Sequence, residues 1–509
     1  MGGDSLRDYF LDSFLTRGEK KAISFLRDGI VETQLSYREL NQDSNRMANT
    51  FLDLGVKKGE RVILYLPKSL GFVVAHFALQ KIGAIEVPLN PGFKKSEMLY
   101  LLEDTEPKLV LSGSEQQSII KEINPHLTTI VIATERPYQG LDFFRSASDG
   151  LPNVAMGAED PGLIIYTSGT TGKPKGAILS QGNLVCDARN VIRMWEITES
   201  DVLCHALPLF HIHGLCFALH TALIAGSHVL ILDEFSPEEV IEVLARKEGE
   251  YACTLFMAVP SMYGKMMDYL GEKVLDFEHI RLWTSGSAPL LPTDFERVKK
   301  VFGKEPVERE GMSETGMNFS NPLRGLRKPG SIGLPLPGVQ VRIVDPETLK
   351  DVVPGETGEI WLRGPNVTPG YWRKPEETAM AFEEGWLRTG DLGRVDEEGY
   401  YYLTDRIKHI IISGGENISP KEVETVINQL GGVVESSVVG IPDEKWGEKV
   451  VAAVVTKPGS RIKPQEIRDF CKKHLHDWKC PKEIVFLKEL PKNKMGKVLK
   501  EEVKQSFKR

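Results

Sequence analysis

The sequence lacks several features that would assign a chain to a compartment or to a structural class. Only six cysteines occur among 509 residues, and none forms a Cys-x-x-Cys pair. No zinc spacing is therefore present, and free thiols in a reducing compartment are expected. The N-terminus has no basic segment followed by an apolar one, so no signal peptide is expected. Leu6 stands where the myristoylation pattern requires Ser or Thr.

Long apolar runs are also scarce. The longest, residues 214–232, contains His220, Ser227 and His228. A core helix followed by a strand is expected there, and no transmembrane segment. The net charge of −8 argues against a nucleic-acid partner, because neutralising phosphates requires a basic surface. These absences predict a cytoplasmic protein that does not bind nucleic acid.

Short apolar runs alternate with helical patterns through the first part of the chain. Residues 61–66 are typical of a strand, residues 70–82 of a helix and residues 84–88 of the next strand. Further strands are expected at 108–111, 128–133, 162–166 and 228–232. Such alternation predicts the α/β class, with parallel sheets covered by helices.

The pattern changes from residue 338 to residue 404. Short β-rich runs at 339–344, 358–363 and 400–404 are separated by Gly and Pro, which is typical of a small barrel or antiparallel sheet. A helix is expected from Pro420 to Gln429, within a compact α+β tail. We place a domain boundary near Asp405. Residues 1–404 would form the large N-terminal domain and residues 405–509 a small C-terminal domain.

The segment most informative about function is Thr167-Ser-Gly-Thr-Thr-Gly-Lys-Pro-Lys-Gly176, which follows the apolar strand. Its glycines and hydroxyls allow N–H and O–H groups to surround phosphate oxygens, and Lys173 and Lys175 add positive charge. It is not a Walker loop, because Pro174 stands where that motif needs Ser or Thr. A flexible surface linker is the alternative, but the position after a buried strand favours phosphate binding.

At this loop the sequence resembles the adenylate-forming superfamily of acyl-CoA synthetases, adenylation domains and luciferases. Seven further segments continue the resemblance in order, at 207–214, 284–289, 311–314, 389–391, 405–408, 414–417 and 491–497. The resemblance covers nearly the whole chain. It implies an ATP-dependent acid–thiol ligase, which converts a carboxylic acid, ATP and CoA through an acyl-adenylate to acyl-CoA, AMP and pyrophosphate.

The resemblance also implies a site for ATP, Mg²⁺ and CoA. The phosphate loop would contribute Thr167, Ser168, Gly169, Thr170, Thr171, Gly172 and Lys175. The adenine side would comprise Gly286, Ser287, Glu310, Gly311, Met312 and Ser313. Asp391 and Arg406 would bind the ribose.

Catalysis must bring a carboxylate to the α-phosphate, so the site must position two anions and supply positive charge. The resemblance assigns Mg²⁺ binding to Glu314 and Thr167. It assigns His211 to the substrate carboxylate and Lys497 to the bridging and acyl oxygens.

The second half-reaction requires CoA to reach the anhydride formed in the first. The resemblance implies that the small C-terminal domain is mobile and rotates about the hinge residue Lys408. This rotation would withdraw Lys497 and present Gly415 to the pantetheine channel.

One position departs from the family pattern. The residue before Gly311 is usually aromatic and stacks on adenine, whereas this chain has Glu310. A carboxylate cannot stack and adds negative charge near the nucleotide. Either another residue covers the adenine or ATP binds more weakly.

The sequence indicates the identity of the acid less clearly than it indicates the reaction. Residues 258–265 and 308–322 are most similar to malonyl-CoA synthetases, in which basic residues hold the second carboxylate. Arg309 and Lys265 are the candidates, because Arg can bind a carboxylate through two hydrogen bonds; Met317 is a further substrate-binding candidate. Arg309 could instead pair with an adjacent glutamate. The same local pattern occurs in ligases of medium- or long-chain fatty acids, so both substrate classes stay open.

Other readings compete with a CoA ligase. A stand-alone adenylation domain would load a carrier protein, and a luciferase-type oxidase would share only the first half-reaction. A degenerate homologue would bind nucleotide without catalysis, but the retained Glu314, Asp391, Arg406 and Lys497 argue against it. A homodimer is compatible with the sequence.

Overall fold

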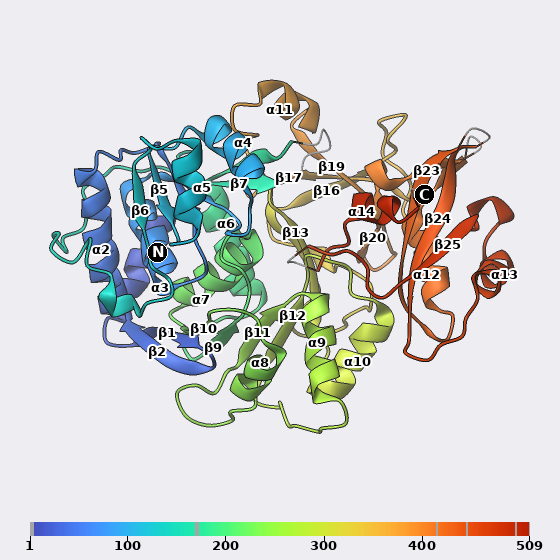
Figure 1. The fold of residues 1–509 in the computed structure, drawn as a ribbon, viewed down its shortest axis with the longest axis horizontal. Coiled ribbons are helices and arrows are strands. Elements are labelled where there is room, and N and C mark those ends of the chain that lie inside the picture. Colours follow the sequence, from blue (N-terminus) through green and yellow to red (C-terminus); the bar gives the residue numbers. More distant parts are fainter. Residues whose placement is uncertain (1–4, 168–172, 414–415, 444–445, 494–495, 508–509) are drawn as a thin grey trace. The chain divides into compact units, whose positions relative to one another are not determined.

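The computed structural model describes residues 5–167, 173–413, 416–443, 446–493 and 496–507. The chain forms two compact units (Figure 1). Unit 1 comprises residues 1–340 and 363–387, and unit 2 comprises residues 341–362 and 388–509. Residues within each unit pack mainly against one another. The boundary near Asp405 and the rotation about Lys408 remain predictions.

Two sheets form the framework of unit 1 and confirm the predicted α/β class. One has the strand order β6-β5-β3-β4-β7-β8 and the other β15-β14-β13-β12-β11-β9-β10-β1-β2. The strands of the first sheet are β3 (Arg61–Tyr65), β4 (Ile85–Pro88), β5 (Leu109–Ser112), β6 (Thr129–Val131), β7 (Pro161–Thr167) and β8 (Lys175–Ser180). The strands of the second are β1 (Lys21–Arg27), β2 (Ile30–Ser36), β9 (Val202–His205), β10 (His228–Leu232), β11 (Leu255–Ala258), β12 (Leu282–Ser285), β13 (Val307–Met312), β14 (Gly316–Ser320) and β15 (Leu334–Pro335). Strands β3, β4 and β5 are parallel, as the βαβ alternation predicted.

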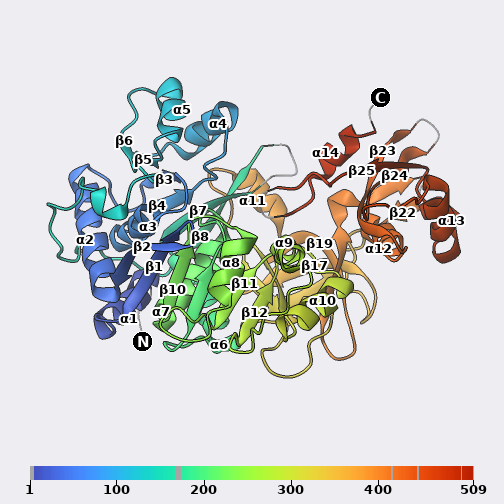
Figure 2. The same ribbon diagram turned by 60° about the horizontal axis from the view of Figure 1, so that its bottom comes forward.

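Helices cover these sheets (Figure 2). They are α1 (Leu6–Thr16), α2 (Tyr37–Asp53), α3 (Leu70–Ile82), α4 (Lys95–Thr105), α5 (Gln116–Ile123), η1 (Tyr138–Gly140), α6 (Gln181–Met194), α8 (Pro237–Leu244), α9 (Pro260–Leu270), α10 (Pro292–Phe302) and α11 (Pro375–Ala381). Helix α3 matches the predicted range. The Ser69 side chain accepts the Phe72 N–H at its start, which satisfies a donor that the helix leaves unpaired. Gly83, at φ 65°, ends it.

The apolar stretch of residues 214–232 forms a helix followed by a strand, as predicted, but the helix is unusual. Its first part is the π-helix η2 (His213–His220), whose residues are all buried. It continues into α7 (Thr221–Ala225), and Gly226, at φ 84°, turns the chain into β10. π-Helices are rare and occur mostly at functional sites, so η2 is a candidate part of the functional site. None of the helices formed by the described residues is both long and apolar enough to cross a membrane.

The β-rich region forms a sheet in which residues 386–395 pair antiparallel with residues 382–383 and 401–406. It has the order β16-β17-β19-β18, and β20 pairs with β19. Its strands are β16 (Gln340–Val344), β17 (Gly358–Arg363), β18 (Phe382–Glu383), β19 (Trp386–Val395) and β20 (Tyr401–Arg406). The β19–β20 register sets Asp391 opposite Arg406.

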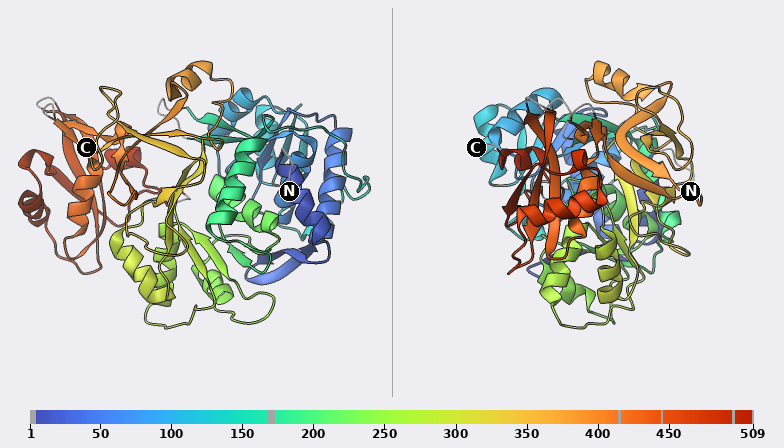
Figure 3. Two further views of the ribbon diagram at one scale, coloured as in Figure 1. Left: turned by 180° about the vertical axis from the view of Figure 1, so that it is seen from behind. Right: turned by 90° about the vertical axis from the view of Figure 1, so that its right-hand side faces the viewer.

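The C-terminal part of unit 2 is a second sheet, with the order β22-β21-β24-β23 and β25 on β24. Its elements are η3 (Ile407–His409), β21 (Ile411–Ser413), β22 (Glu416–Ile418), α12 (Pro420–Asn428), β23 (Val433–Asp443), β24 (Gly447–Thr456), α13 (Pro464–His474), η4 (Asp477–Lys479), β25 (Glu483–Leu487) and α14 (Lys500–Gln505). One apolar core joins α12 and α13 to the sheet, and a second core joins Val503 of α14 to its other face (Figure 3). The predicted α+β tail is thus confirmed.

Candidate functional site

The β13–β14 hairpin of unit 1 carries several of the predicted residues. Its register pairs Gly311 with Met317 and Met312 with Gly316. A Cβ atom at Gly311 would lie 2.5 Å from the Gly316 carbonyl oxygen, so this crossing of the strands requires glycine. The turn between the strands contains Ser313 and Glu314.

Arg309, on β13, is a buried cation. Its side chain is 2% exposed, and none of its three guanidinium nitrogens has a hydrogen-bond partner among the described residues. Burial lowers the pKa of Arg309 to about 10, although the charges of Glu310 and Asp187 favour the cation. It therefore remains charged at neutral pH. Buried guanidinium groups are normally paired, because an unpaired buried charge is costly.

Three neighbours define the space around the Arg309 guanidinium. The Cζ atom lies 4.8 Å from the ring centroid of Phe217 on η2. A Cβ atom at Gly286 would lie 2.6 Å from Arg309 Cζ and Nε, so only glycine leaves room for this arginine. Asp187, on α6, exerts an attractive charge interaction on Arg309 and accepts the Met317 N–H at 2.8 Å. Burial raises the pKa of Asp187 to about 7.

The charge of Arg309 acts on His213, and His213 in turn contacts His211. The His213 Nδ1 atom lies 3.2 Å from the Ser287 hydroxyl, and the His213 N–H donates to His211 Nδ1 at 3.3 Å. Burial, and secondarily the charge of Arg309, lowers the pKa of His213 well below its ordinary value. The structure therefore brings together Arg309, Gly286, Ser287, His211 and, through Asp187, Met317.

Tyr371, which the sequence analysis did not single out, links Lys175 at the end of the phosphate loop to Glu314. The Thr167 hydroxyl donates to the Lys175 carbonyl oxygen at 3.5 Å, and the Lys175 ammonium lies 5.5 Å from the Tyr371 ring centroid. The Tyr371 hydroxyl donates to Glu314 Oε1 at 3.2 Å. Thr167, Lys175 and Glu314 thus share one region of unit 1. The predicted residues Ser168, Gly169, Thr170, Thr171 and Gly172 lie outside the described residues.

The residues present fit Mg²⁺, which needs few protein ligands, better than a metal ion whose ligands all come from the protein. Over the described ranges, no three His, Cys, Asp or Glu side chains form a metal-binding group. Mg²⁺ typically takes one or two carboxylates and completes its shell with phosphate oxygens and water. Glu314, which is 9% exposed, and the Thr167 hydroxyl supply oxygen ligands of the required kind.

Glu310 belongs to a polar network and not to an aromatic surface. Its Oε2 atom accepts the Asn318 amide N–H at 3.1 Å, and Asn318 also donates to the Thr315 hydroxyl at 2.8 Å. Asn366 donates to Asn318 Oδ1 at 3.1 Å. These amides hold the carboxylate in a fixed position on β13.

Lys265 lies apart from the buried arginine. Helix α9 buries Met262, Met266 and Leu270, and Lys265 occupies its exposed face. Arg309 is therefore the candidate for the second carboxylate that the structure surrounds with other predicted residues.

In unit 2, Asp391 and Arg406 form an ion pair across β19 and β20. The Arg406 Nε atom lies 2.5 Å from Asp391 Oδ1, and its Nη2 donates to Asp391 Oδ2 at 3.2 Å. Asp391 is 6% exposed. Burial raises its pKa, and Arg406 opposes that effect. The pair orients a carboxylate that is suited to accept ribose hydroxyls.

Lys497 and Lys408 are also in unit 2, and both are exposed. The Lys497 backbone is held by Asn493, whose side-chain oxygen accepts its N–H at 3.0 Å. Gly496, at φ 75°, turns the chain before it. Gly415 lies outside the described residues.

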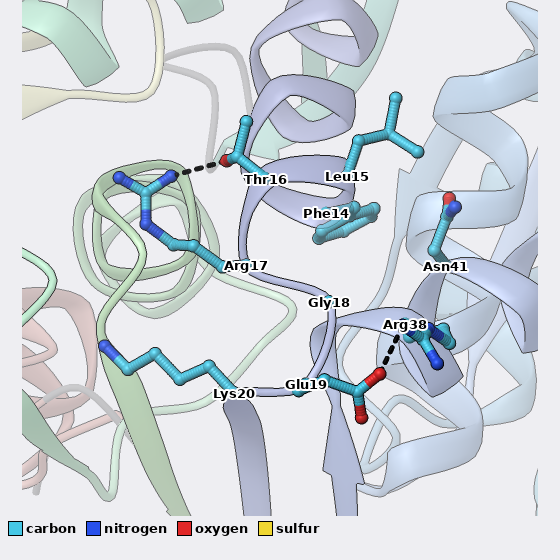
Figure 4. A pocket seen from close by; sticks show the side chains of 9 residues that line it. All are labelled: Phe14, Leu15, Thr16, Arg17, Gly18, Glu19, Lys20, Arg38 and Asn41. Atoms are coloured by element: carbon cyan, nitrogen blue, oxygen red, sulfur yellow. Dashed lines mark hydrogen bonds and ion pairs between the residues drawn. The ribbon is translucent and has the colours of Figure 1, made fainter.

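A separate hollow of about 470 Å³ lies between the end of α1 and the start of α2 (Figure 4). Its cations are engaged: Arg38 pairs with Glu19, Arg17 with Glu199 at 2.9 Å, and Lys20 with backbone carbonyl oxygens. It contains no residue predicted to bind substrate or cofactor.

Sequence reasoning missed Asp187, Phe217 and Tyr371. Nothing in the local sequence singles out Asp187 or Phe217, because their neighbours come from distant segments. Tyr371 follows Pro369 and Gly370 in the sequence Pro-Gly-Tyr-Trp. A tyrosine hydroxyl directly after such a turn could have been named as a candidate site residue from the sequence.

Comparisons with known proteins give the family. Residues 13–372 match the AMP-binding enzyme family, and residues 422–497 match the AMP-binding enzyme C-terminal domain. The mitochondrial malonate–CoA ligase of Bos taurus is 35% identical over 514 residues, which cover 92% of this chain and 86% of that protein. A long-chain-fatty-acid–CoA ligase of Bacillus subtilis is 31% identical over 531 residues, which cover 97% and 93%.

A solved structure supports the same family assignment. ATP-bound MatB from Rhodopseudomonas palustris superposes with a TM-score of 0.93 at 36% identity, over 100% of this chain and 99% of that one. The predicted use of ATP, Mg²⁺ and CoA is confirmed by the family. The chain belongs to the AMP-binding enzyme family and is an ATP-dependent, AMP-forming acid–CoA ligase.

Proposed function

We propose that this ligase activates a short dicarboxylic acid such as malonate, and that Arg309 binds the carboxylate that does not react. The observation that carries the proposal is the buried guanidinium of Arg309, whose nitrogens have no hydrogen-bond partner among the described residues. The similarity to a malonate–CoA ligase supports it.

The physical argument rests on what the Arg309 environment favours. A guanidinium in a buried setting binds a carboxylate through two parallel hydrogen bonds, and such charge-assisted bonds are the strong ones. The ring of Phe217 packs against the guanidinium, and Gly286 leaves room for it. A fatty acid would place an alkyl chain beside this cation and leave it unpaired.

For the nucleotide, we propose the roles that the resemblance assigns. Thr167 and Glu314 would hold Mg²⁺, which neutralises charge on the triphosphate. Tyr371, as donor to Glu314, would orient that carboxylate. In unit 2, Asp391 would accept the ribose hydroxyls with Arg406 as its support.

We also propose that the two half-reactions use different residues. Lys497 would stabilise the developing charge during adenylate formation, because a positioned cation of this kind lowers that barrier. Rotation of residues 405–509 about Lys408 would then permit thiol attack. The family assignment supports this division of roles.

The test is CoA-dependent AMP release across acetate, propionate, malonate, succinate, medium- and long-chain fatty acids and an aromatic acid. We expect a short diacid to give the highest kcat/KM, and we expect Arg309→Ala to remove that preference. Lys265→Ala is the matched control, since it removes a cation on the exposed side of α9, and it should leave the ranking unchanged. Highest turnover of a fatty acid, or an unaltered ranking in Arg309→Ala, contradicts the proposal.

Location in the cytoplasm and assembly as a homodimer remain proposals. The bovine relative is mitochondrial by name, so cell fractionation must decide the first. Light scattering on the purified protein decides the second, and a monomer mass would contradict it.

A further inference from the structure

Unit 1 contains a buried chain of three titratable side chains that the proposed reaction does not use. The His76 Nδ1 atom lies 2.5 Å from Glu86 Oε2, and His76 Nε2 lies 2.9 Å from His220 Nε2. All three residues are 0% exposed. Among the described residues, Glu86 Oε1 and His220 Nδ1 have no hydrogen-bond partner. We call Glu86, His76 and His220 the buried triad.

The triad joins three elements that are far apart in the sequence. His76 is on α3, which lies beside β4, the strand that carries Glu86 (Figure 2). His220 ends η2, 144 residues after His76. The rings of His76 and His220 are stacked, with centroids 4.9 Å apart.

One end of the triad leads to the phosphate loop. Glu86 pairs in parallel with Leu163 of β7, and β7 ends at Thr167, where the phosphate loop begins. The position of Glu86 is thus tied by sheet hydrogen bonds to the strand that presents this loop.

The other end leads to the carboxylate site. From His220, η2 runs back to Phe217, which lies against Arg309, and to His213, which contacts Ser287. The first turn of η2 is also fixed, because His205 Nε2 lies 2.8 Å from the Gly214 carbonyl oxygen. A Cβ atom at Gly214 would overlap the Pro208 carbonyl oxygen at 2.1 Å.

Stability alone is a weak explanation for this triad. Well-packed apolar residues can replace buried ionic groups at little loss or with a gain, and two of the triad's polar atoms are unsatisfied. What the triad provides is a directional connection between β4 and η2, because hydrogen bonds fix both distance and orientation.

We propose that Glu86, His76 and His220 are positioning residues, which set the placement of η2 relative to β4 and β7 and so the distance between the acid-binding residues and the phosphate loop. Adenylation requires the carboxylate oxygen and the α-phosphate within about 3–3.5 Å, and a misplacement near 1 Å costs on the order of 100-fold in rate. The inference rests on the proposed acid site around Arg309.

The test compares triad variants with a matched buried histidine. His220→Gln and Glu86→Gln each break one end of the triad and keep the side chain polar. His228→Gln is the control: His228, on β10, is buried, lies 2.9 Å from the Ser24 hydroxyl and is outside the triad. ATP–pyrophosphate exchange is measured with the acid that the wild-type protein uses best, together with the thermal midpoint.

We expect both triad variants to lower the exchange kcat by roughly 30- to 100-fold, with the KM for ATP within about twofold. His228→Gln should lower kcat by no more than about threefold at a comparable midpoint. Triad variants that lose no more activity than His228→Gln overturn the inference. Because the best acid is used, whatever its class, the result can be read even if the diacid proposal fails.

A triple variant keeps the inference testable if the single variants do not fold. Glu86→Leu, His76→Leu and His220→Leu together replace the triad by apolar side chains, which a buried position tolerates. A folded triple variant with exchange reduced at least about tenfold supports positioning by hydrogen bonds. A folded triple variant with wild-type exchange contradicts it.

Discussion

Replacing Arg309 by methionine should raise the free energy of unfolding and strongly lower diacid activation in the same protein. Methionine retains the unbranched stem but removes the charge. Burial lowers the pKa of Arg309 to about 10, and the shift from the ordinary value of an arginine, at about 1.4 kcal/mol per pH unit, means that the buried cation destabilises the fold by about 3 kcal/mol. This destabilisation is fully present below pH 10, where the group is charged in both states. It is lost progressively as the pH rises from about 10 towards the ordinary pKa of an arginine, because the folded protein releases the proton first.

The expected gain in stability can be measured as a thermal midpoint. Unfolding entropy is about 2 cal/mol/K per residue, so for a unit of this size 3 kcal/mol corresponds to a rise of about 4 °C. The carboxylate bound by Arg309 loses a buried ion pair, which costs about 3–5 kcal/mol. The kcat/KM for malonate should therefore fall roughly 10²- to 10³-fold.

The assay is differential scanning calorimetry of ligand-free protein at pH 7.5, paired with CoA-dependent AMP release for malonate and propionate. Propionate activation should be retained, because a monocarboxylate does not need the guanidinium. A midpoint that falls, or losses of equal size for malonate and propionate, would refute the reasoning, since either result would show that Arg309 supports the fold.

Three further predictions concern the nucleotide and the two half-reactions. Lys497→Ala should lower adenylate formation by about 10²- to 10³-fold in pyrophosphate exchange while thiol transfer from supplied acyl-adenylate stays near wild type; equal losses would rule out separate roles. Glu310→Tyr should lower the KM for ATP, because an aromatic ring can stack on adenine, and an unchanged or higher KM would count against this. Tyr371→Phe removes the donor to Glu314 and should raise the half-saturating Mg²⁺ concentration about tenfold in a titration at fixed ATP; no shift would separate Tyr371 from the metal site.

Much of the fold could be predicted from local sequence patterns. The apolar run predicted the bounds of α3, and the structure shows Ser69 at its start and Gly83 at its end. The Gly- and Pro-separated runs predicted a small barrel or an antiparallel sheet. The π-helical form of η2 could not be predicted, because its apolar residues would suit an α-helix equally. Tertiary packing against α6, β9 and β14 selects the form.

The candidate site likewise has features that local sequence predicts and features that depend on tertiary packing. Arg309, Glu314 and Asp391 stand in recognisable segments, so the sequence singled them out as candidates. The neighbours that give Arg309 its character, Phe217 and Asp187, lie 92 and 122 residues earlier in the chain, and only the folded chain brings them together.

Lys265 illustrates a choice that the sequence left open. Met262, Met266 and Leu270 recur at helical spacing, and all are buried. The structure places Lys265 on the exposed side of α9. The sequence left Arg309 and Lys265 as candidates side by side, and only the structure distinguishes the buried arginine from the exposed lysine.

The central claim is that this acid–CoA ligase selects an acid with a second carboxylate. The most direct measurement is the ratio of kcat/KM for malonate to that for propionate, which has the same number of carbons and one carboxylate fewer. We predict a ratio of at least about 100, from a buried ion pair worth about 3 kcal/mol or more. A ratio of 1 or below would contradict the account.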